Sequence, residues 1–209
     1  MSTALLQTTF FGPIQWYQKL YRYEQTLIEQ YDSYQKQTYR NRCVIATANG
    51  LQVLTVPVEH NADSQELIAN SPKVKDLRIS DHNQWRRIHW NALQSAYSES
   101  PFFDYYADDI RPFFEKKYDY LVDFNEAIRQ TVCDLLDIHP NVSYTSGFSH
   151  QLSGTDDFRE VIHAKHPQHD ADFQPRRYWQ VFERKYGFQA NLSILDLLFN
   201  MGNEAIFYL

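Results

Sequence analysis

The first 30 residues constrain the fold of this chain most. A short apolar run at residues 4–6 leads through a polar and aromatic stretch to Pro13, and apolar or aromatic residues then recur at helical spacing between residues 14 and 21. Proline is favoured in the first turn of a helix, where its missing N–H needs no partner. An extended run begins at Leu27. This order predicts a βαβ unit with two parallel strands.

A hairpin is the next predicted element. Residues 42–48 and 51–58 are strand-like runs separated by Asn49-Gly50, a dipeptide that supplies the positive φ angles of a type I′ turn. Pairing Ala48 with Leu51 places apolar residues on both faces of the two strands. We therefore expect the hairpin to lie inside the sheet and to be covered on each side.

The rest of the chain reads as helices with one more strand. Asp81 and Gln84 resemble a capping box, and it opens a helix in which Trp85, His89, Leu93 and Tyr97 recur every fourth residue. The further expected elements are a long helix from Pro112 to before Pro140, a strand over 142–145, a helix over 158–164, and a last helix over 193–200 that Gly202 ends.

These elements define one fold class. The 209 residues suit one domain, residues 1–209. We expect an α/β fold whose mixed sheet contains the N-terminal βαβ unit and the central antiparallel hairpin, covered by helices.

Charge and hydropathy exclude several functions. The net charge of −6 opposes binding of the molecule as a whole to nucleic acid and to anionic membranes. No apolar run reaches the ~20 residues of a membrane span, and residues 1–7 lack the features of a secretion signal. Cys43 and Cys133 lie far apart in the sequence, which argues against a disulfide scaffold. We expect a cytoplasmic protein without a membrane span.

The segment from Ser33 to Val58 contains no acidic residue, yet it carries Lys36, Arg40 and Arg42. If the first hairpin strand extends back to Tyr34, the three cations share one of its faces. Arginine binds phosphate or carboxylate through two parallel hydrogen bonds, so a small molecule with such a group is the predicted partner. Alternatively, carboxylates from packed helices neutralise these cations.

The loop between the first strand and the first helix is a second candidate for binding an anion. Thr8, Thr9 and Gly12 precede a helix N-terminus, where backbone N–H groups and the helix dipole favour negative charge. The loop has no glycine-rich nucleotide-binding signature, and the alternative is a purely structural turn.

His89 is the candidate general base, because its pKa normally lies near neutral pH. It shares a helix face with Trp85 and Tyr97, whose rings offer flat surfaces for a sugar or base. Alternatively, His89 is a half-buried residue that is hydrogen-bonded to backbone.

One cluster resembles a metal site only in composition: His163, His166, His169, Asp170 and Asp172. Pro167 breaks the helical face that would align the imidazoles, so we expect a solvated loop and no metal. No motif identifies a cofactor, and no nucleophile motif such as G-x-S-x-G is present.

Seven stretches in this order make the chain similar to the WbqC-like protein family. They are Phe10–Pro13, Lys36–Arg42, Leu54–Val58, Trp85–Trp90, Ala96–Tyr97, Pro101–Tyr106 and Asn191–Asn200. The positions that match the family are Lys36, Asn41, Arg42, Trp85, His89 and Tyr97, and they include cationic, histidine and aromatic candidates given above. The run Leu6-Gln7-Thr8 departs from the family, whose members often have His-Gln-Pro there.

The resemblance implies a bacterial cytoplasmic protein of surface-polysaccharide (O-antigen type) biosynthesis. The activity suggested for the family is transfer of an acyl or aminoacyl group, such as glycyl, to a nucleotide-linked amino sugar. In such a transferase, Lys36, Arg40, Asn41 and Arg42 would hold a phosphate-bearing substrate beside Trp85 and Tyr97, and His89 would move a proton. The missing histidine leaves a second hypothesis, a non-catalytic binding module, and a plain scaffold is the third.

Overall fold

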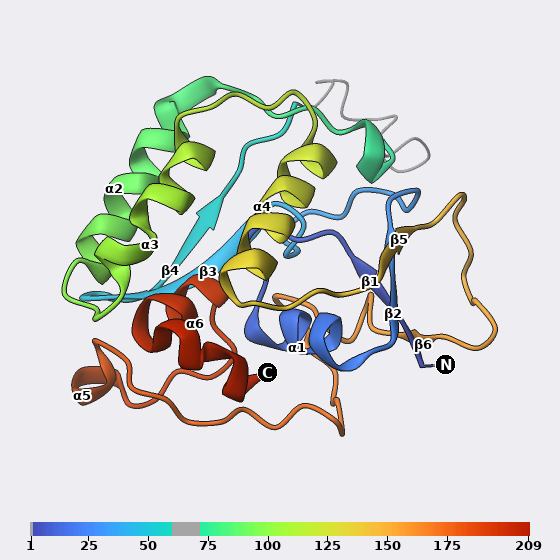
Figure 1. Ribbon diagram of the computed structural model, residues 1–209. Coiled ribbons are helices and arrows are strands. Elements are labelled where there is room, and N and C mark those ends of the chain that lie inside the picture. Colours follow the sequence, from blue (N-terminus) through green and yellow to red (C-terminus); the bar gives the residue numbers. More distant parts are fainter. Residues whose placement is uncertain (1, 60–71) are drawn as a thin grey trace.

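The computed structural model describes residues 2–59 and 72–209 of an α/β protein (Figure 1). The strands are β1 (Thr3–Gln7), β2 (Gln25–Glu29), β3 (Arg42–Thr47), β4 (Gly50–Thr55), β5 (Val142–Tyr144) and β6 (Asp156–Asp157). The α-helices are α1 (Ile14–Arg22), α2 (Trp85–Tyr97), α3 (Phe103–Ile110), α4 (Leu121–Leu135), α5 (Glu183–Tyr186) and α6 (Ile194–Met201). Short 3-10 helices span Val74–Asp76, His82–Gln84, Arg111–Phe114 and Gly202–Tyr208.

A four-stranded parallel sheet has the order β5-β2-β1-β6. α1 connects β1 to β2, which confirms the predicted βαβ unit and parallel pair. α1 and α4 lie on one side of this sheet, and the connection from β5 to β6 passes along the other (Figure 1). Coverage of both faces explains why Ala4, Leu5 and Leu6 are all buried, although alternate residues of a strand point to opposite faces.

The hairpin forms a separate antiparallel pair, β3-β4. Its turn consists of Ala48 and Asn49, and only Gly50 takes a positive φ, 102°. The predicted type I′ turn is therefore wrong, since it needs positive φ at both Asn49 and Gly50. One face of the hairpin is buried, but on the other Leu51 is 56% exposed and Val53 48% exposed. The expected coverage of both faces is also wrong.

β3 begins at Arg42 and does not extend back to Tyr34. Residues 31–41 form turns and bends, with a φ of 65° at Gln37, so the preceding cations do not line one face of a strand. Lys36 is exposed, whereas Arg40 is buried.

Two helix predictions fail at their ends. α2 exists with the predicted buried stripe, but it begins at Trp85 without a side-chain cap, so Asp81 and Gln84 form no capping box. The long helix predicted from Pro112 is divided into a 3-10 turn and α4. It is interrupted because residues 119 and 120 pair through their backbones with residues 78 and 79.

The C-terminal predictions are confirmed except for one helix. The strand over 142–145 appears as β5, and the last helix appears as α6, where the Ser193 hydroxyl accepts from Leu195 N and Gly202 follows the end. Residues 158–164 form turns and bends instead of a helix. There the Phe158 amide extends the pairing of β6 by donating to the carbonyl of Leu5 at 2.9 Å.

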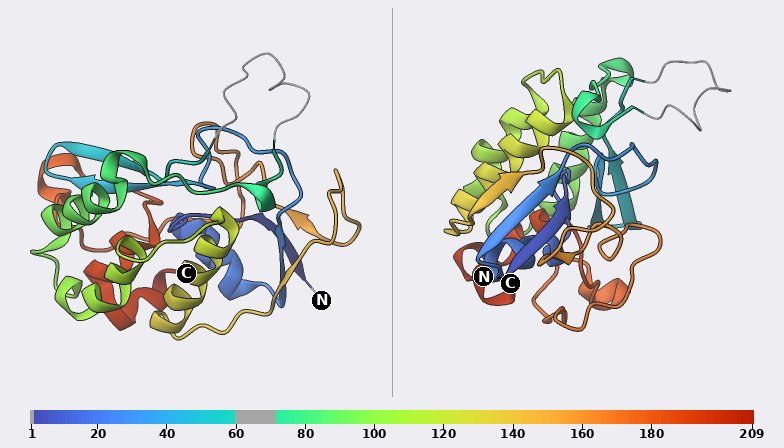
Figure 2. Two further views of the ribbon diagram at one scale, coloured as in Figure 1. Left: turned by 90° about the horizontal axis from the view of Figure 1, so that it is seen from above. Right: turned by 90° about the vertical axis from the view of Figure 1, so that its right-hand side faces the viewer.

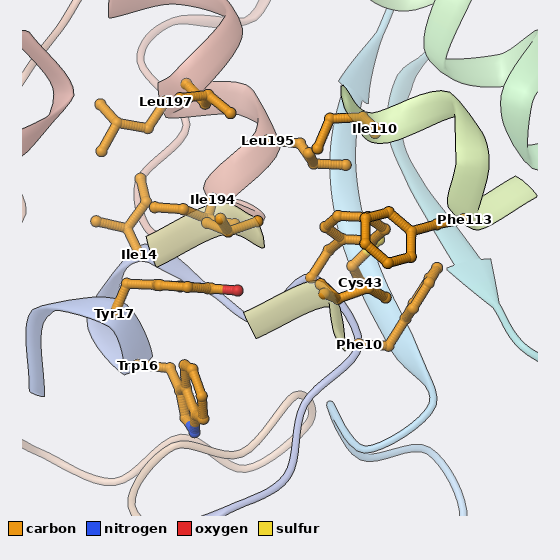
Figure 3. Close-up of a cluster of buried hydrophobic side chains, with 14 of the residues drawn as sticks. Phe10, Ile14, Trp16, Tyr17, Cys43, Ile110, Phe113, Ile194, Leu195 and Leu197 are labelled. Atoms are coloured by element: carbon orange, nitrogen blue, oxygen red, sulfur yellow. The ribbon is translucent and has the colours of Figure 1, made fainter. Parts of the chain in front are cut away.

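The core lies where α1, β3, α6 and the loop after β1 meet. Figure 3 shows Phe10 from that loop near Cys43 of β3, with Leu195 of α6 above them and Trp16 and Tyr17 of α1 on the opposite side of the cluster. All five side chains are almost fully buried. This packing fixes the loop that leads from the carboxyl end of β1 into α1.

Candidate functional site at the carboxyl edge of the parallel sheet

The site lies where β1 and β2 end and α4 crosses beside them. Thr8 and Thr9 follow β1, Gln30 follows β2, and Asn125 of α4 faces them across a narrow recess. In open parallel sheets, ligands bind outside the carboxyl ends of the strands. The recess measures about 10 Å³, which is room for one water-sized group.

Four of the buried polar atoms without a hydrogen-bond partner belong to the segments that meet at this edge. Among the described residues, Thr9 Oγ1, Asp32 Oδ1, Arg40 Nε and Asn125 Oδ1 are buried and have no hydrogen-bond partner. The side chains of Thr9, Arg40 and Asn125 are 3%, 2% and 1% exposed. A buried polar atom without a partner costs about 1–3 kcal/mol. We call these four residues, Thr9, Asp32, Arg40 and Asn125, the edge site.

Direct contacts hold the edge site together. Asn125 Nδ2 donates to Thr8 Oγ1 at 3.1 Å and to the carbonyl of Arg40 at 2.8 Å. The Phe10 amide donates to the carbonyl of Tyr39 at 2.9 Å. Three segments that are distant in sequence are thereby joined: the loop after β1, the turns before β3, and α4. The orientation of the Asn125 amide is consequently fixed, with its Oδ1 left over.

Gly12 leaves space for one side chain of the edge site. A Cβ atom at Gly12 would lie 2.4 Å from Thr9 Oγ1, a distance that no real contact reaches. The glycine is thus required by the position of the Thr9 hydroxyl, so the structure gives it a steric contribution, whereas the sequence predicted a role in binding an anion.

Arg40, whose carbonyl accepts from Asn125, and Glu29, which precedes Gln30, each form a buried ion pair. The Arg40 guanidinium bonds to Asp32, and Arg159 Nη1 lies 3.3 Å from Glu29 Oε2. Burial raises the pKa of the Asp32 carboxyl, and the attraction of Arg40 opposes this rise without cancelling it. Asp32 comes one residue before the acid-free segment, so the counter-charge of Arg40 was just outside that window.

Backbone N–H groups at the N-terminus of α1 donate to acceptors within the protein. The Ile14 amide donates to the carbonyl of Leu192 at 3.0 Å, and the Gln15 amide donates to Asn191 Oδ1 at 2.9 Å. The loop over residues 8–12 is itself buried. Thr8 and Thr9 can therefore contribute to the edge site through their side chains.

The remaining predicted residues before β3 are more dispersed. Asn41 is buried and its Nδ2 donates to the carbonyl of Val56 at 2.8 Å. Lys36 is exposed on a turn. Arg42 is half-buried, and its Nε has no partner among the described residues. Arg42 and Arg40 both lie close enough to Tyr34 to lower its pKa, while burial raises it more.

The predicted residues of α2 face the core. The His89 ring is packed among Phe10, Trp85 and Phe114, with centroids 5.2–6.4 Å away. Burial lowers its pKa to about 4, so the imidazole is neutral at pH 7. Its Nδ1 has no partner in the described part of the chain. Trp85 Nε1 donates to the carbonyl of Ser80 at 2.9 Å.

Tyr97 belongs to a second polar cluster around Asp196, which sequence reasoning missed. The Asp196 carboxylate is 1% exposed and accepts from Tyr97 OH at 2.7 Å, Tyr178 OH at 2.6 Å and Gln180 Nε2 at 3.0 Å. Burial raises the pKa of Asp196, and these donors partly oppose the rise. We call these four residues the Asp196 network. The sequence signal for this network was an acidic residue inside the apolar run 194–199. The corresponding signal for the edge site was Asn125 on the apolar stripe of α4.

Within the described ranges, no three His, Cys, Asp or Glu side chains are grouped so that they could hold a metal ion. His163 Nδ1 instead accepts from the amides of Lys165 at 3.0 Å and His166 at 3.1 Å. A search of the described helices finds none long and apolar enough to cross a membrane.

Comparison with known proteins connects this chain to one family. The profile of the WbqC-like protein family matches residues 7–168, which include the whole edge site. The chain is 29% identical over 203 residues to the uncharacterized protein Rv1507c of Mycobacterium tuberculosis, covering 84% of this chain and 83% of that protein. No solved structure matches the chain significantly.

Proposed function

Because the chain belongs to the WbqC-like protein family, we propose that it is a transferase of bacterial surface-polysaccharide (O-antigen type) biosynthesis and that the edge site receives one polar group of its substrate. The observation that carries this proposal is the set of four buried, unpartnered polar atoms at the carboxyl edge. A ligand group that bonds to these atoms would remove the cost of leaving them unpaired.

The atoms left over indicate the chemistry of that group. Asp32 Oδ1 and Asn125 Oδ1 are acceptors, Arg40 Nε is a donor, and Thr9 Oγ1 both donates and accepts. An amine or hydroxyl of a sugar supplies the matching donors. Lys36 and Arg42 lie on the turns and at the strand start that follow Asp32, where they would meet a phosphate. A nucleotide-linked amino sugar, the acceptor suggested by the family resemblance, carries both kinds of group. The amine nitrogen would form an amide bond with the carbonyl carbon of an activated acyl or aminoacyl donor, such as a glycyl donor. The bond from that carbon to the donor's leaving group would break, and the nitrogen would lose a proton to solvent.

A second function is favoured by the surroundings of His89. Its ring is enclosed by aromatic side chains and its pKa of about 4 makes it a weak base at neutral pH. Leu6 and Thr8 also stand where relatives often have His and Pro. These features favour a binding module that holds the same ligand in the same pathway and catalyses nothing.

Calorimetry with UDP-glucosamine and UDP-N-acetylglucosamine tests the site. We expect UDP-glucosamine, which carries the free amine, to bind to the wild type. It should bind at least ten-fold more weakly to Thr9→Val and to Asn125→Leu, since each substitution removes one matched group. Asp108→Asn changes an exposed carboxyl of α3 and is the matched control. Absence of heat with both sugars, together with an unchanged melting temperature, would refute the site.

Product analysis separates the two functions. The wild type is incubated with the amino-sugar nucleotide and activated acyl donors, and mass spectrometry follows the mass of the sugar. A mass increase that disappears in Asn125→Leu supports the transferase. Binding without a mass increase from any donor supports the binding module.

A further inference from the structure

A second surface of the protein combines exposed apolar side chains with positive charge. It lies on the far side of the hairpin from its buried face and continues onto residues 175–187, which contain α5. We call it the α5 patch, and its main members are Leu51, Val53, Trp179, Arg184, Lys185 and Tyr186.

Its apolar members protrude into solvent. Leu51 and Val53 lie on the open face of the hairpin, and Trp179 is 51% exposed. Trp179 stands between Tyr178 and Gln180, which are both buried in the Asp196 network, so its indole points away from the protein. Trp16 and Trp85 are buried and Trp90 is half-buried. Trp179 is consequently the most exposed of the four tryptophans.

The charge of the patch opposes that of the whole chain. Residues 175–187 carry Arg176, Arg177, Arg184 and Lys185 against one acidic residue, Glu183, which pairs with Arg177 at 2.6 Å. The hairpin contributes no acidic residue between positions 42 and 58. Residues 175–187 and the hairpin are therefore positively charged, although the net charge of the whole chain is −6.

Two hydrogen bonds join α5 to the hairpin turn. Lys185 Nζ and Tyr186 OH each donate to the carbonyl of Ala48 in the hairpin turn, both at 2.8 Å. Figure 2 shows α5 beside the end of the hairpin. Between them lies a largely apolar hollow of about 130 Å³, lined by Leu51, Phe182 and Tyr186 among others.

We propose that the α5 patch docks the protein on an anionic lipid bilayer. Arg184 and Lys185 would attract the acidic headgroups, and each such cation contributes about five-fold to binding. Trp179 would insert at the headgroup level, where an indole finds both apolar and polar surroundings, and Leu51 and Val53 would enter the same layer. Charge complementarity selects an anionic surface, and protruding aliphatic side chains favour a bilayer over a soluble polyanion.

Vesicle sedimentation with the full chain tests this proposal. We expect binding to vesicles of phosphatidylglycerol and phosphatidylethanolamine, and at least ten-fold weaker binding to phosphatidylcholine alone. Arg184→Glu should weaken the binding by more than five-fold, and Trp179→Ser by about five-fold. The fluorescence of the wild type should shift to the blue on binding, and this shift should vanish in Trp179→Ser.

Lys116→Glu and Tyr105→Ser are the matched controls, because both residues are exposed and lie outside the patch. They should bind vesicles as the wild type does. Equal binding to both kinds of vesicle would overturn the proposal, as would weakening by the controls to the same extent. Binding to soluble heparin as tight as to anionic vesicles, with no blue shift, would assign the patch to an acidic macromolecule and overturn it as well.

Discussion

The edge site and the Asp196 network are both buried polar clusters, but they differ in how far their atoms are satisfied. Around Asp196, two tyrosine hydroxyls and a glutamine amide donate to one carboxylate. In the edge site, each of the four side chains keeps one atom without a partner among the described residues. The two clusters have similar burial, so exposure does not explain the difference.

This difference separates a structural cluster from a binding one. A satisfied network joins elements: Asp196 of α6 is linked to α2 through Tyr97, and Tyr97 OH also accepts from the Ala46 amide of β3 at 3.4 Å. An unsatisfied cluster stores a free-energy cost that a ligand can relieve. The comparison therefore predicts that mutations in the two clusters act on different observables, stability in one and ligand affinity in the other.

Asp196→Ala is expected to have the largest effect on stability. The substitution leaves two buried tyrosine hydroxyls without their acceptor and removes one of the three acceptors of Gln180 Nε2, and such losses reduce the free energy of unfolding by about 3–5 kcal/mol. Chemical denaturation measures this loss. Asp196→Asn keeps one acceptor oxygen and should have an intermediate effect, and Asp108→Ala on the exposed face of α3 should change stability by less than about 0.5 kcal/mol. A cost of Asp196→Ala as small as that of the control would contradict the structural role of the network.

His89 sharpens the comparison because it is buried and has an unpartnered Nδ1, yet lies outside the edge site. Its pKa falls from 6.5 to about 4 on folding, so the unfolded chain binds more protons between these values. Stability should therefore fall as the pH is lowered from 6.5 to 4, by about 3 kcal/mol from this group. Denaturation curves of the wild type and His89→Phe give the difference, in which titration of the carboxyl groups cancels. Parallel pH profiles of the two proteins would show that His89 is not desolvated.

Local patterns predicted the parts of the fold that depend on neighbours in sequence. The βαβ unit, the hairpin, α2 and α6 all follow from periodicity and from Pro13, Gly50 and Ser193. The failures have long-range causes. The helix expected from Pro112 is interrupted by backbone pairing with residues 78 and 79, and residues 158–164 continue the edge of the parallel sheet instead of forming a helix. Neither partner is visible from the segment itself.

The candidate site was predicted only in part for the same reason. Thr8, Thr9, Arg40 and Asn41 were singled out, and the structure brings the first three to the carboxyl edge. Asp32 and Asn125 were not predicted. Asp32 lies one residue before the acid-free segment, and Asn125 is a single polar residue on an otherwise apolar helix face. Whether a polar side chain is satisfied depends on the packing of distant segments, which spacing alone does not reveal.

The smallest changes in stability are predicted for two substitutions that each remove one hydroxyl, one from each cluster. Tyr97→Phe removes a hydroxyl that bonds to a carboxylate at 2.7 Å, so it should cost about 2 kcal/mol of stability. Thr9→Val removes a buried hydroxyl that has no partner among the described residues and preserves its shape. It should leave stability unchanged or raise it by up to about 1 kcal/mol, because an unsatisfied polar atom is removed without leaving a cavity. Thermal and chemical denaturation of both variants measure whether each substitution lowers or raises the stability. Equal destabilisation would mean that the Thr9 hydroxyl is satisfied in solution, and the edge site would then be a second structural network.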